Sequence, residues 1–212
     1  MAALQLTLLG GFQARLPDGR PVVFARKKAQ ALLAYLALQP DRAHPREKLA
    51  ALLWGDVPGE RARHSLRQAL LALRRALSGV AARCVAEEGD GVSVDSSLID
   101  VDVVGFERLA VEATGEALER ASTMYRGDLL EGIAVDEPPF EEWLRTERAR
   151  LRELATEVLA RLLAQQERAA QVDQAVVTAV RLLGLDPAQE PVHRTLMRLY
   201  ARQGRRGAAL RQ

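Results

Sequence analysis

Residues 60–77 constrain the fold more than any other segment, because they are predicted to form a helix with two different faces. At about 100° per residue, the apolar side chains fall on one stripe that is wide enough to be buried: Leu66, Ala69, Leu70, Leu73 and Leu77. The opposite side carries Arg61, His64, Gln68 and Arg75, with Arg67 and Arg74 at its flanks. Such groups can pair with base edges in the DNA major groove and with phosphates. A solvated surface helix is the alternative interpretation.

The segments before this helix favour the first interpretation. Residues 45–54 form a second amphipathic segment, in which Pro45 suits the first turn of a helix. Glycine and proline in residues 55–59 separate the two helices by only a few positions. A further helix is predicted over residues 26–38, with its inward positions at Ala29, Leu32, Leu33 and Leu36. Short helices joined by a tight turn, the last one basic, are typical of a helix-turn-helix arrangement.

Basic side chains also gather where these helices begin. Arg26, Lys27 and Lys28 begin the first helix, where positive charge opposes the helix dipole. A bound phosphate would offset that cost, whereas a solvated helix start is the alternative. The predicted phosphate-contacting residues are Lys27, Lys28, Arg46, Lys48, Arg67 and Arg74.

Charge is segregated along the chain, although the net charge of all 212 residues is only +2. Residues 24–83 hold 12 Lys/Arg and 4 Asp/Glu, a net charge of +8. Residues 84–147 hold 4 Lys/Arg and 17 Asp/Glu, a net charge of −13. Residues 148–212 hold 12 Lys/Arg and 6 Asp/Glu, a net charge of +6. The first basic block coincides with the three predicted helices, as expected of a DNA-binding module. The acidic block is expected to face away from DNA or to dock on a basic partner.

Length and composition set further bounds. With 212 residues, 48% of them hydrophobic, the chain can build two modest domains. It has no run of eighteen apolar residues, so no membrane span is expected, and its N-terminus lacks the features of a signal peptide. Cys84 is the only cysteine, which favours a reducing cytoplasm.

Nothing in the sequence indicates catalysis or a cofactor. The three histidines, His44, His64 and His193, have no carboxylate or cysteine at metal-ligand spacing. No P-loop and no GxGxxG motif is present. We therefore expect neither an enzyme, nor a metal site, nor a bound cofactor.

The first 98 residues are predicted to form an α+β winged-helix domain. Alternation and turn residues predict short strands at residues 4–9, 12–16 and 21–24, separated by turns at residues 10–11 and 17–19. After the three helices, residues 83–86 and 91–94 are predicted to pair as a hairpin, the wing. Its tip, Glu87 to Gly91, is acidic, which leaves Arg83 as the only nearby cation for a minor-groove contact.

Residues 99–212 are predicted to be all helical, so that the chain is mainly α overall. The expected helices are residues 102–112, 115–124, 139–167, 171–184, 188–203 and a last one from Arg206. A shift of 34 residues superposes Leu162 on Leu196 and Ala175 on Ala209, the period of a tetratricopeptide repeat. We expect stacked helix pairs, with an ordinary helical bundle as the alternative.

The order and spacing of several phrases resemble one family along essentially the whole chain. The phrases are LLGGF (8–12), KKAQALLAYLAL (27–38), REKLAALLWGD (46–56), SLRQALLALRRAL (65–77), DVDVVGF (100–106), YRGDLLEG (125–132), EEWLRTERARLREL (141–154), LLGLDP (182–187) and HRTLMRLYARQGRRGAAL (193–210). The chain is similar to the SARP-type bacterial transcriptional activators, which join an OmpR/PhoB-like winged helix to a tetratricopeptide-like bacterial transcriptional activation domain.

The resemblance implies a cytoplasmic, non-enzymatic activator that binds repeated sites in double-stranded DNA near promoters and contacts RNA polymerase. A homodimer on DNA is left open. The chain stops at Gln212, inside the second helix of a repeat, so we expect a domain truncated at its C-terminus and a fragment of a longer protein. A natural short protein is the alternative. Leu196, Met197, Tyr200 and Leu210 are expected to bury against the preceding helix pair. The alternative function is a protein-interaction adaptor that uses the helical repeats and whose winged helix no longer binds DNA.

Overall fold

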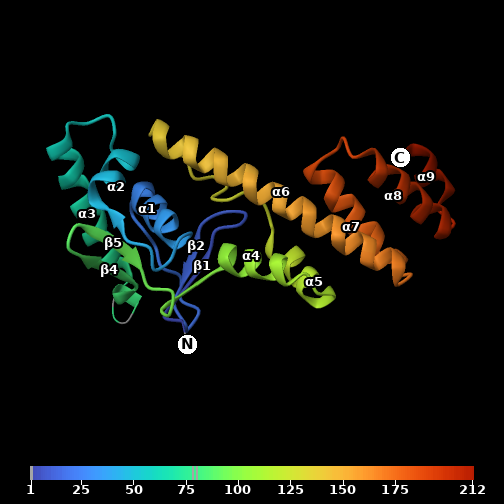
Figure 1. Ribbon diagram of the computed structural model, residues 1–212, viewed down its shortest axis with the longest axis horizontal. Coiled ribbons are helices and arrows are strands. Elements are labelled where there is room, and N and C mark those ends of the chain that lie inside the picture. Colours follow the sequence, from blue (N-terminus) through green and yellow to red (C-terminus); the bar gives the residue numbers. More distant parts are fainter. Residues whose placement is uncertain (1, 78, 80) are drawn as a thin grey trace. The chain divides into compact units, whose positions relative to one another are not determined.

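The computed structural model describes residues 2–77, 79 and 81–212. The chain folds into two units (Figure 1). Unit 1 takes in Met1–Gly105 and Arg126–Arg148, and unit 2 takes in Phe106–Tyr125 and Ala149–Gln212. The sequence places a boundary between a DNA-binding domain and an activation domain at residues 98 and 99. This division concerns function and stays a prediction.

Unit 1 contains two small sheets. The first has the order β2-β1-β6 and consists of β1 (Leu4–Thr7), β2 (Gln13–Arg15) and β6 (Ile99–Val101). Strand β1 runs antiparallel to β2 and parallel to β6. The second is antiparallel, has the order β3-β5-β4 and consists of β3 (His44–Pro45), β4 (Val85–Glu88) and β5 (Gly91–Val94). Leu4 and Leu6 are buried and Gln5 is exposed, so β1 has the alternation expected of a half-buried strand.

Three helices complete the winged-helix core of unit 1. They are α1 (Lys27–Ala37), α2 (Arg46–Leu53) and α3 (Gly59–Leu77), and a short 3₁₀ helix, η1 (Ala81–Cys84), leads into β4. Every residue of α1 except Lys27, Lys28 and Gln30 is buried. A helix that is apolar on nearly all sides lies in a core, which explains why α1 carries more buried residues than its predicted inward stripe.

Residues 126–148 pack against the start of the chain within unit 1. The backbone N–H of Leu130 donates to the carbonyl of Leu8 (2.8 Å), and that of Gly10 donates to Asp128 (3.0 Å). Asp102 accepts from the N–H groups of Leu8 (2.9 Å) and Leu9 (3.0 Å). Gly10 has a φ of +84°, and a Cβ there would lie 3.2 Å from the Cβ of Arg126. The glycine therefore permits both the turn and the close approach.

The short strands differ from the sequence prediction in several places. The first strand ends at Thr7 instead of residue 9, and residues 21–24 form only an isolated bridge between Pro21 and Arg15. The wing begins at Val85, because residues 81–84 form the 3₁₀ helix. Strands β3 and β6 were not predicted. They have two and three residues, too few for a periodic pattern, and depend on partner strands distant in the sequence.

Helices make up unit 2, and two of them also contribute residues to unit 1. They are α4 (Asp102–Glu112), α5 (Gly115–Met124), α6 (Pro138–Arg168), α7 (Val172–Leu185), α8 (Glu190–Arg202) and α9 (Arg206–Arg211). The bounds of α4 and α5 are those predicted from the sequence, and the others differ by at most two residues. Long amphipathic periods are the strongest local signal, which explains this agreement.

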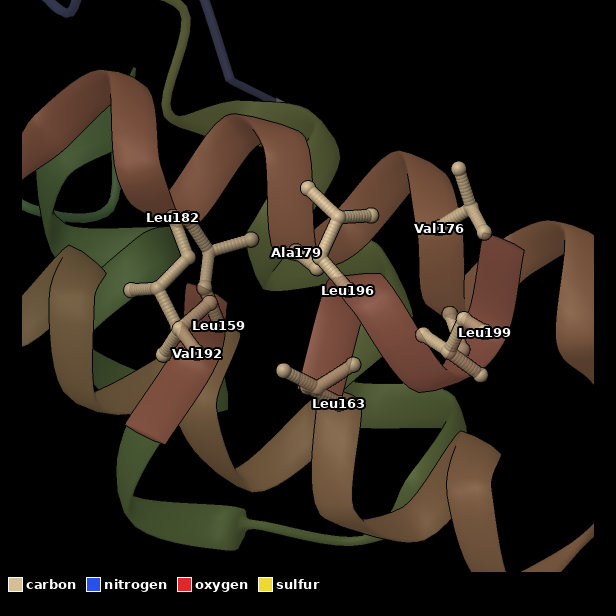
Figure 2. Packing of buried hydrophobic residues seen from close by; sticks show 9 residues of the cluster. Leu159, Leu163, Val176, Ala179, Leu182, Val192, Leu196 and Leu199 are labelled. Atoms are coloured by element: carbon tan, nitrogen blue, oxygen red, sulfur yellow. The ribbon is translucent and has the colours of Figure 1, made fainter. Parts of the chain in front are cut away.

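The core of unit 2 joins α6, α7 and α8. Its buried residues are Leu159, Leu163, Ala175, Val176, Ala179, Leu182, Val192, Leu196 and Leu199. Figure 2 shows the side chains of these three helices turned toward one another. Helix α8 contacts both α7 and α9, as neighbouring helices of a repeat do.

The predicted burial near residue 200 is right for two residues and wrong for two. Leu196 is buried, and Tyr200 packs partly buried against the same core. Met197 is 40% exposed and Leu210 is 86% exposed. No residue of the six-residue α9 is buried, because within the described chain no further helix covers its apolar side. The fold class is nevertheless the predicted one, an α+β winged helix followed by a helical domain, mainly α overall.

Candidate nucleic-acid interface

Helix α3 has the two faces that its sequence predicts. It begins directly after Pro58, whose carbonyl accepts hydrogen bonds from the N–H groups of Arg61 (2.8 Å) and Ala62 (3.0 Å). Its buried residues are Ala62, Leu66, Ala69, Leu70, Leu73 and Leu77. These six anchor the helix to the core, so the opposite face is held at the surface of unit 1 along 19 residues.

All four predicted base-contacting residues lie on that exposed face. Arg61, His64, Gln68 and Arg75 are each exposed. Among the residues that the structure describes, none of their side chains forms a hydrogen bond or an ion pair. Arg67, at the flank of this face, is also exposed, and its side chain has no partner among the described residues. The donors of three guanidinium groups and one amide are thus available to a ligand.

One residue of this face was not predicted from the sequence. Leu71 is 41% exposed and lies on the same stripe, between Gln68 and Arg75 at helical spacing. An exposed leucine among polar side chains can contact the methyl group of thymine. Its spacing could have identified it, but a leucine in a leucine-rich helix reads as a core residue.

The six predicted phosphate-contacting residues fall into two groups. Lys27, Lys48 and Arg67 are exposed, and their side chains have no ion pair within the described part of the chain. Lys28, Arg46 and Arg74 are each paired with a carboxylate of unit 1. Only the first group offers cations whose charge is not already partly neutralised by the protein.

Lys28 links three segments of unit 1. Its Nζ lies 2.5 Å from Oε1 of Glu137 and 5.6 Å from the centroid of the Trp54 ring. Glu137 is buried, and its Oε2 also accepts from the backbone N–H of Gly55 (3.0 Å). A buried carboxylate requires such partners, so Lys28 has a structural role whether or not it also contacts DNA.

Arg46 and Arg74 converge on the wing. Arg46, the first residue of α2, and Arg74, near the end of α3, both form ion pairs with Glu87 of β4, and the distance from Arg74 Nη1 to Glu87 Oε1 is 2.5 Å. The backbone N–H of Arg46 also donates to the carbonyl of Asp90 at the wing tip (2.9 Å). The wing is therefore tied to both helices of the helix-turn-helix. Arg83 is exposed at its base.

A hollow of about 320 Å³ lies between the starts of α2 and α3 and the wing. It is lined by Arg46, Glu47, Glu60, Arg63, Leu66, Arg67 and Asp90. Arg63 lies 3.1 Å from Glu60 and 3.5 Å from Glu47, so acidic and basic side chains alternate around the hollow. Arg67 is the cation of this group without a carboxylate partner among the described residues.

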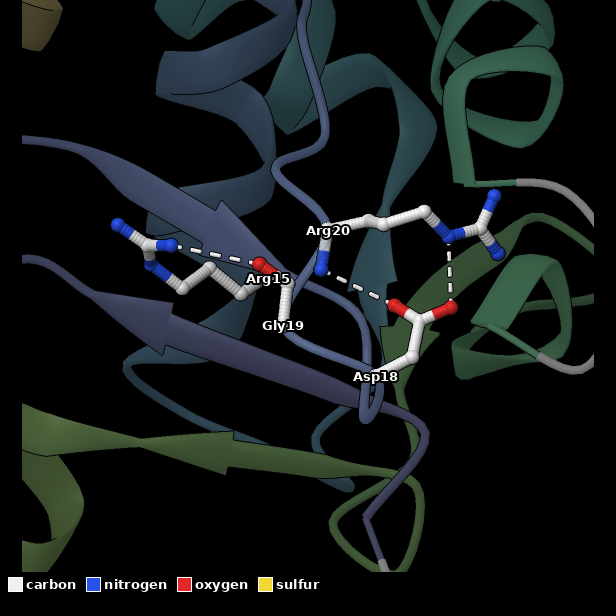
Figure 3. A network of polar contacts seen from close by, with 4 residues as sticks. All are labelled: Arg15, Asp18, Gly19 and Arg20. Carbon is white, nitrogen blue, oxygen red and sulfur yellow. Dashed lines mark hydrogen bonds and ion pairs between the residues drawn. The ribbon is translucent and has the colours of Figure 1, made fainter.

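Two further arginines of unit 1 are engaged in a turn instead of forming part of a basic face (Figure 3). Arg20 donates to Asp18 from its backbone N–H (3.0 Å) and from Nε (2.6 Å), and Arg15 donates to the carbonyl of Gly19 (3.3 Å). These bonds from Arg20 hold the pKa of Asp18 below its usual value. The turn predicted at residues 17–19 is present, and the charge of Arg20 is balanced there by Asp18.

The described residues contain no cluster of three or more His, Cys, Asp or Glu side chains that could hold a metal ion. In the same residues no helix combines the length and the apolarity that crossing a bilayer requires.

Comparison with known families and structures finds a matching family and matching solved structures. The profile of the family described as bacterial transcriptional activator domain matches residues 101–212. The solved structure described as "Mycobacterium tuberculosis EmbR in complex with low affinity phosphopeptide" matches 99% of this chain, with a TM-score of 0.72 and 23% sequence identity. This chain covers 57% of that one. No curated protein gives a significant match. At 23% identity the structural likeness supports the fold alone, whereas the family match confirms the resemblance inferred from the sequence phrases.

Proposed function

Because the chain belongs to the family of proteins that carry a bacterial transcriptional activator domain, we propose that it is a sequence-specific, DNA-binding regulator that activates transcription through contact with RNA polymerase. Residues 1–98 serve as the DNA-binding domain, and residues 99–212 serve as the activation domain. The observation that carries the proposal is the exposed face of α3, which combines cationic and amide donors without partners among the described residues.

In this proposal α3 enters the major groove with Arg61, His64, Gln68 and Arg75 toward the base edges. Arginine suits guanine and glutamine suits adenine, because each can form two hydrogen bonds with that base. The apolar side chain of Leu71 between Gln68 and Arg75 adds a contact to a thymine methyl group. The predicted phosphate contacts come from Lys27, Lys28, Arg46, Lys48, Arg67 and Arg74, which position the helix without reading sequence.

The test of base readout begins with selection of a binding site from random or genomic DNA. Affinity for the selected duplex and for single-base variants is then measured by fluorescence anisotropy. Arg75→Ala and Gln68→Ala are expected to cost about 1–3 kcal/mol and to relax preference at one base position. Arg120→Ala, at an exposed arginine of α5, is the control and should change nothing. Unchanged specificity in Ala variants of all four residues contradicts the assignment.

The phosphate contacts are tested by the dependence of affinity on salt. Lys48→Ala and Arg67→Ala should weaken all DNA sites alike and reduce the salt slope by about one unit each, because each removes one cation that releases a counterion. A separate titration at a DNA concentration well above the Kd gives the stoichiometry on DNA, monomer or homodimer. Equal slopes for the wild type and the double variant would refute this part of the proposal.

Contact with RNA polymerase is tested on the acidic start of α6. Glu142 is exposed, whereas Glu141 accepts a hydrogen bond from the backbone of Val135 (3.0 Å) and so supports the fold. Glu142→Lys should leave DNA affinity nearly unchanged and reduce transcription in vitro if the polymerase reads this surface. Full transcription by this variant would exclude the surface as the contact.

The adaptor function is the other outcome of these experiments. If the wild type shows no DNA affinity that depends on salt, the winged helix does not bind DNA. The helical repeats then provide the surface that binds a partner protein.

A further inference from the structure

Glu87 occupies a position on the wing that its sequence context does not explain. A strand that flanks a DNA-binding helix is expected to offer cations, yet the wing carries Glu87, Glu88 and Asp90. Glu88 and Asp90 are exposed at the tip, whereas Glu87 points its carboxylate at two arginines. One oxygen pairs with Arg46 and the other, at 2.5 Å, with Arg74.

This arrangement differs from the other ion pairs around α3 in its burial. The side chains of Glu87, Arg46 and Arg74 are 20%, 25% and 40% exposed, whereas Glu60, which pairs with Arg63, is 84% exposed. Exposed pairs contribute little because water and salt screen them, and partly buried pairs are screened less. Glu87 therefore holds its two arginines more firmly than Glu60 holds Arg63.

We propose that Glu87 is an internal competitor of DNA phosphate for Arg46 and Arg74, and so limits how tightly the helix-turn-helix holds the DNA backbone. The proposal rests on the DNA-binding function proposed above. A carboxylate and a phosphate both take the paired N–H donors of a guanidinium group. When DNA binds, a phosphate must displace Glu87, and the freed carboxylate recovers the counterions and water that the phosphate gives up.

The competition also affects how the affinity for DNA depends on salt concentration. A cation that is free in the unbound protein neutralises a phosphate and thereby releases a counterion. An arginine that only exchanges carboxylate for phosphate releases almost none. Arg46 and Arg74 should therefore contribute little to the salt slope of the wild type, whereas Arg67 and Lys48 contribute fully.

The test compares Glu87→Gln with Glu88→Gln. Both variants remove one negative charge from the same hairpin, but only the first frees Arg46 and Arg74. Affinity for the selected duplex and for an unrelated duplex is measured from 50 to 200 mM salt. Relative to Glu88→Gln, we expect Glu87→Gln to bind both duplexes more tightly at 50 mM, with a slope steeper by about one to two units. Two added contacts correspond to roughly a tenfold larger loss of affinity across that salt range.

A second comparison separates competition from a merely structural role. Arg46→Ala should change the slope little in the wild type and reduce it by about one unit in the Glu87→Gln background. If Glu87 only holds the wing in place, Glu87→Gln lowers affinity at every salt concentration and the effect of Arg46→Ala is the same in both backgrounds. Either that result or equal slopes for Glu87→Gln and Glu88→Gln overturns the proposal. Absence of DNA binding by the wild type and all variants refutes the proposed function itself, and the competition with it.

Discussion

His44 is a single buried residue that makes the stability of the fold depend on pH. It lies in β3, is almost fully buried, and packs its ring edge-on against Tyr35 at a centroid distance of 5.1 Å. Its Nε2 has no hydrogen-bond partner among the described residues. Burial, and secondly the charges of Arg42 and Lys48, lower the pKa of His44 below 6.5. The imidazole is therefore neutral in the folded protein near pH 7.

Stability should fall as this histidine is forced to take up a proton. Because the folded pKa is lowered, the unfolded chain binds more protons below about pH 6.5. We expect the free energy of unfolding to decrease as pH falls from 6.5 toward the folded pKa. His44→Phe, which keeps an aromatic ring, should flatten this decrease in urea titrations at several pH values. His64→Phe, at an exposed histidine, should retain the wild-type dependence, and an unaltered slope in His44→Phe would show that other groups cause it.

Cys84 is predicted to be chemically inert in the folded protein. Burial, assisted by the charge of Asp95, raises the pKa of its thiol to about 11. Because the thiolate is the reactive form, iodoacetamide at pH 8 should label Cys84 only after unfolding in denaturant, as followed by mass spectrometry. A Cys84→Ser, Ser96→Cys variant, with its thiol at an exposed position, should react while folded. Rapid labelling of the native wild type would mean that the region around η1 opens locally.

At the residue scale, the sequence predicted which side chains of α3 face solvent but not how their neighbours use them. Exposure follows from helical periodicity, which is local. The pairing of Glu87 with Arg46 depends on the register of β3 against β5, which places His44 opposite Val92 and Pro45 opposite Gly91, residues far apart in the sequence. No local pattern in either segment indicates that register, so the neutralisation of Arg46 and Arg74 could not be predicted. The pairing of Lys28 with Glu137 likewise joins residues that are far apart in the sequence.

At the element scale, α5 is held by a side chain from another helix. Arg181 of α7 donates from Nη2 to the carbonyl of Ser122 (2.6 Å) and to that of Tyr125 (3.2 Å). The last carbonyls of a helix lack partners within it, and a cation there also meets the negative end of the helix dipole. Arg181 thus caps the C-terminus of α5 within unit 2.

Removal of this cap should weaken unit 2. Arg181→Ala is expected to lower the free energy of unfolding by about 1–3 kcal/mol, since it leaves two carbonyls without a charged donor. Chemical denaturation measures the change. Arg181→Lys should recover part of the loss, and Arg120→Ala on α5 itself should have little effect. A loss in Arg120→Ala as large as in Arg181→Ala would assign the effect to net charge instead of the cap.

The elements themselves show where sequence reasoning succeeds. Helices such as α4 and α5 repeat their apolar positions over three turns, and their bounds follow from the sequence alone. The strand predicted at residues 21–24 forms only one bridge, because no neighbouring strand pairs with it along its whole length. Whether a short strand forms depends on the strands that lie beside it.

At the scale of the whole molecule, the acidic block from 84 to 147 is partly an internal counterion. Its Glu87 and Glu137 pair with cations of the first basic block, and Glu107 lies 2.6 Å from Arg150 of the second. Of these pairs, only that of Glu107 with Arg150 corresponds to the expected docking on a basic partner, here one of the Arg-rich helices that follow the acidic block. The return of residues 126–148 into unit 1 rests on such long-range contacts, including the bond from the N–H of Leu130 to the carbonyl of Leu8 (2.8 Å) and the ion pair of Glu137 with Lys28. Local sequence patterns do not reveal these contacts.

Each unit has its own apolar core, so the two should lose structure separately. Leu196 is buried in the core of unit 2, and Leu196→Ala is expected to cost about 2–5 kcal/mol through lost contacts and the cavity left behind. Hydrogen exchange should then show weaker protection in α7 and α8, with β1 of unit 1 unchanged. Leu210→Ala removes the same atoms from a side chain that is 86% exposed, and should alter protection nowhere. If Leu196→Ala weakens β1 as much as α8, the long helix α6, which contributes to both units, couples them into one cooperative structure.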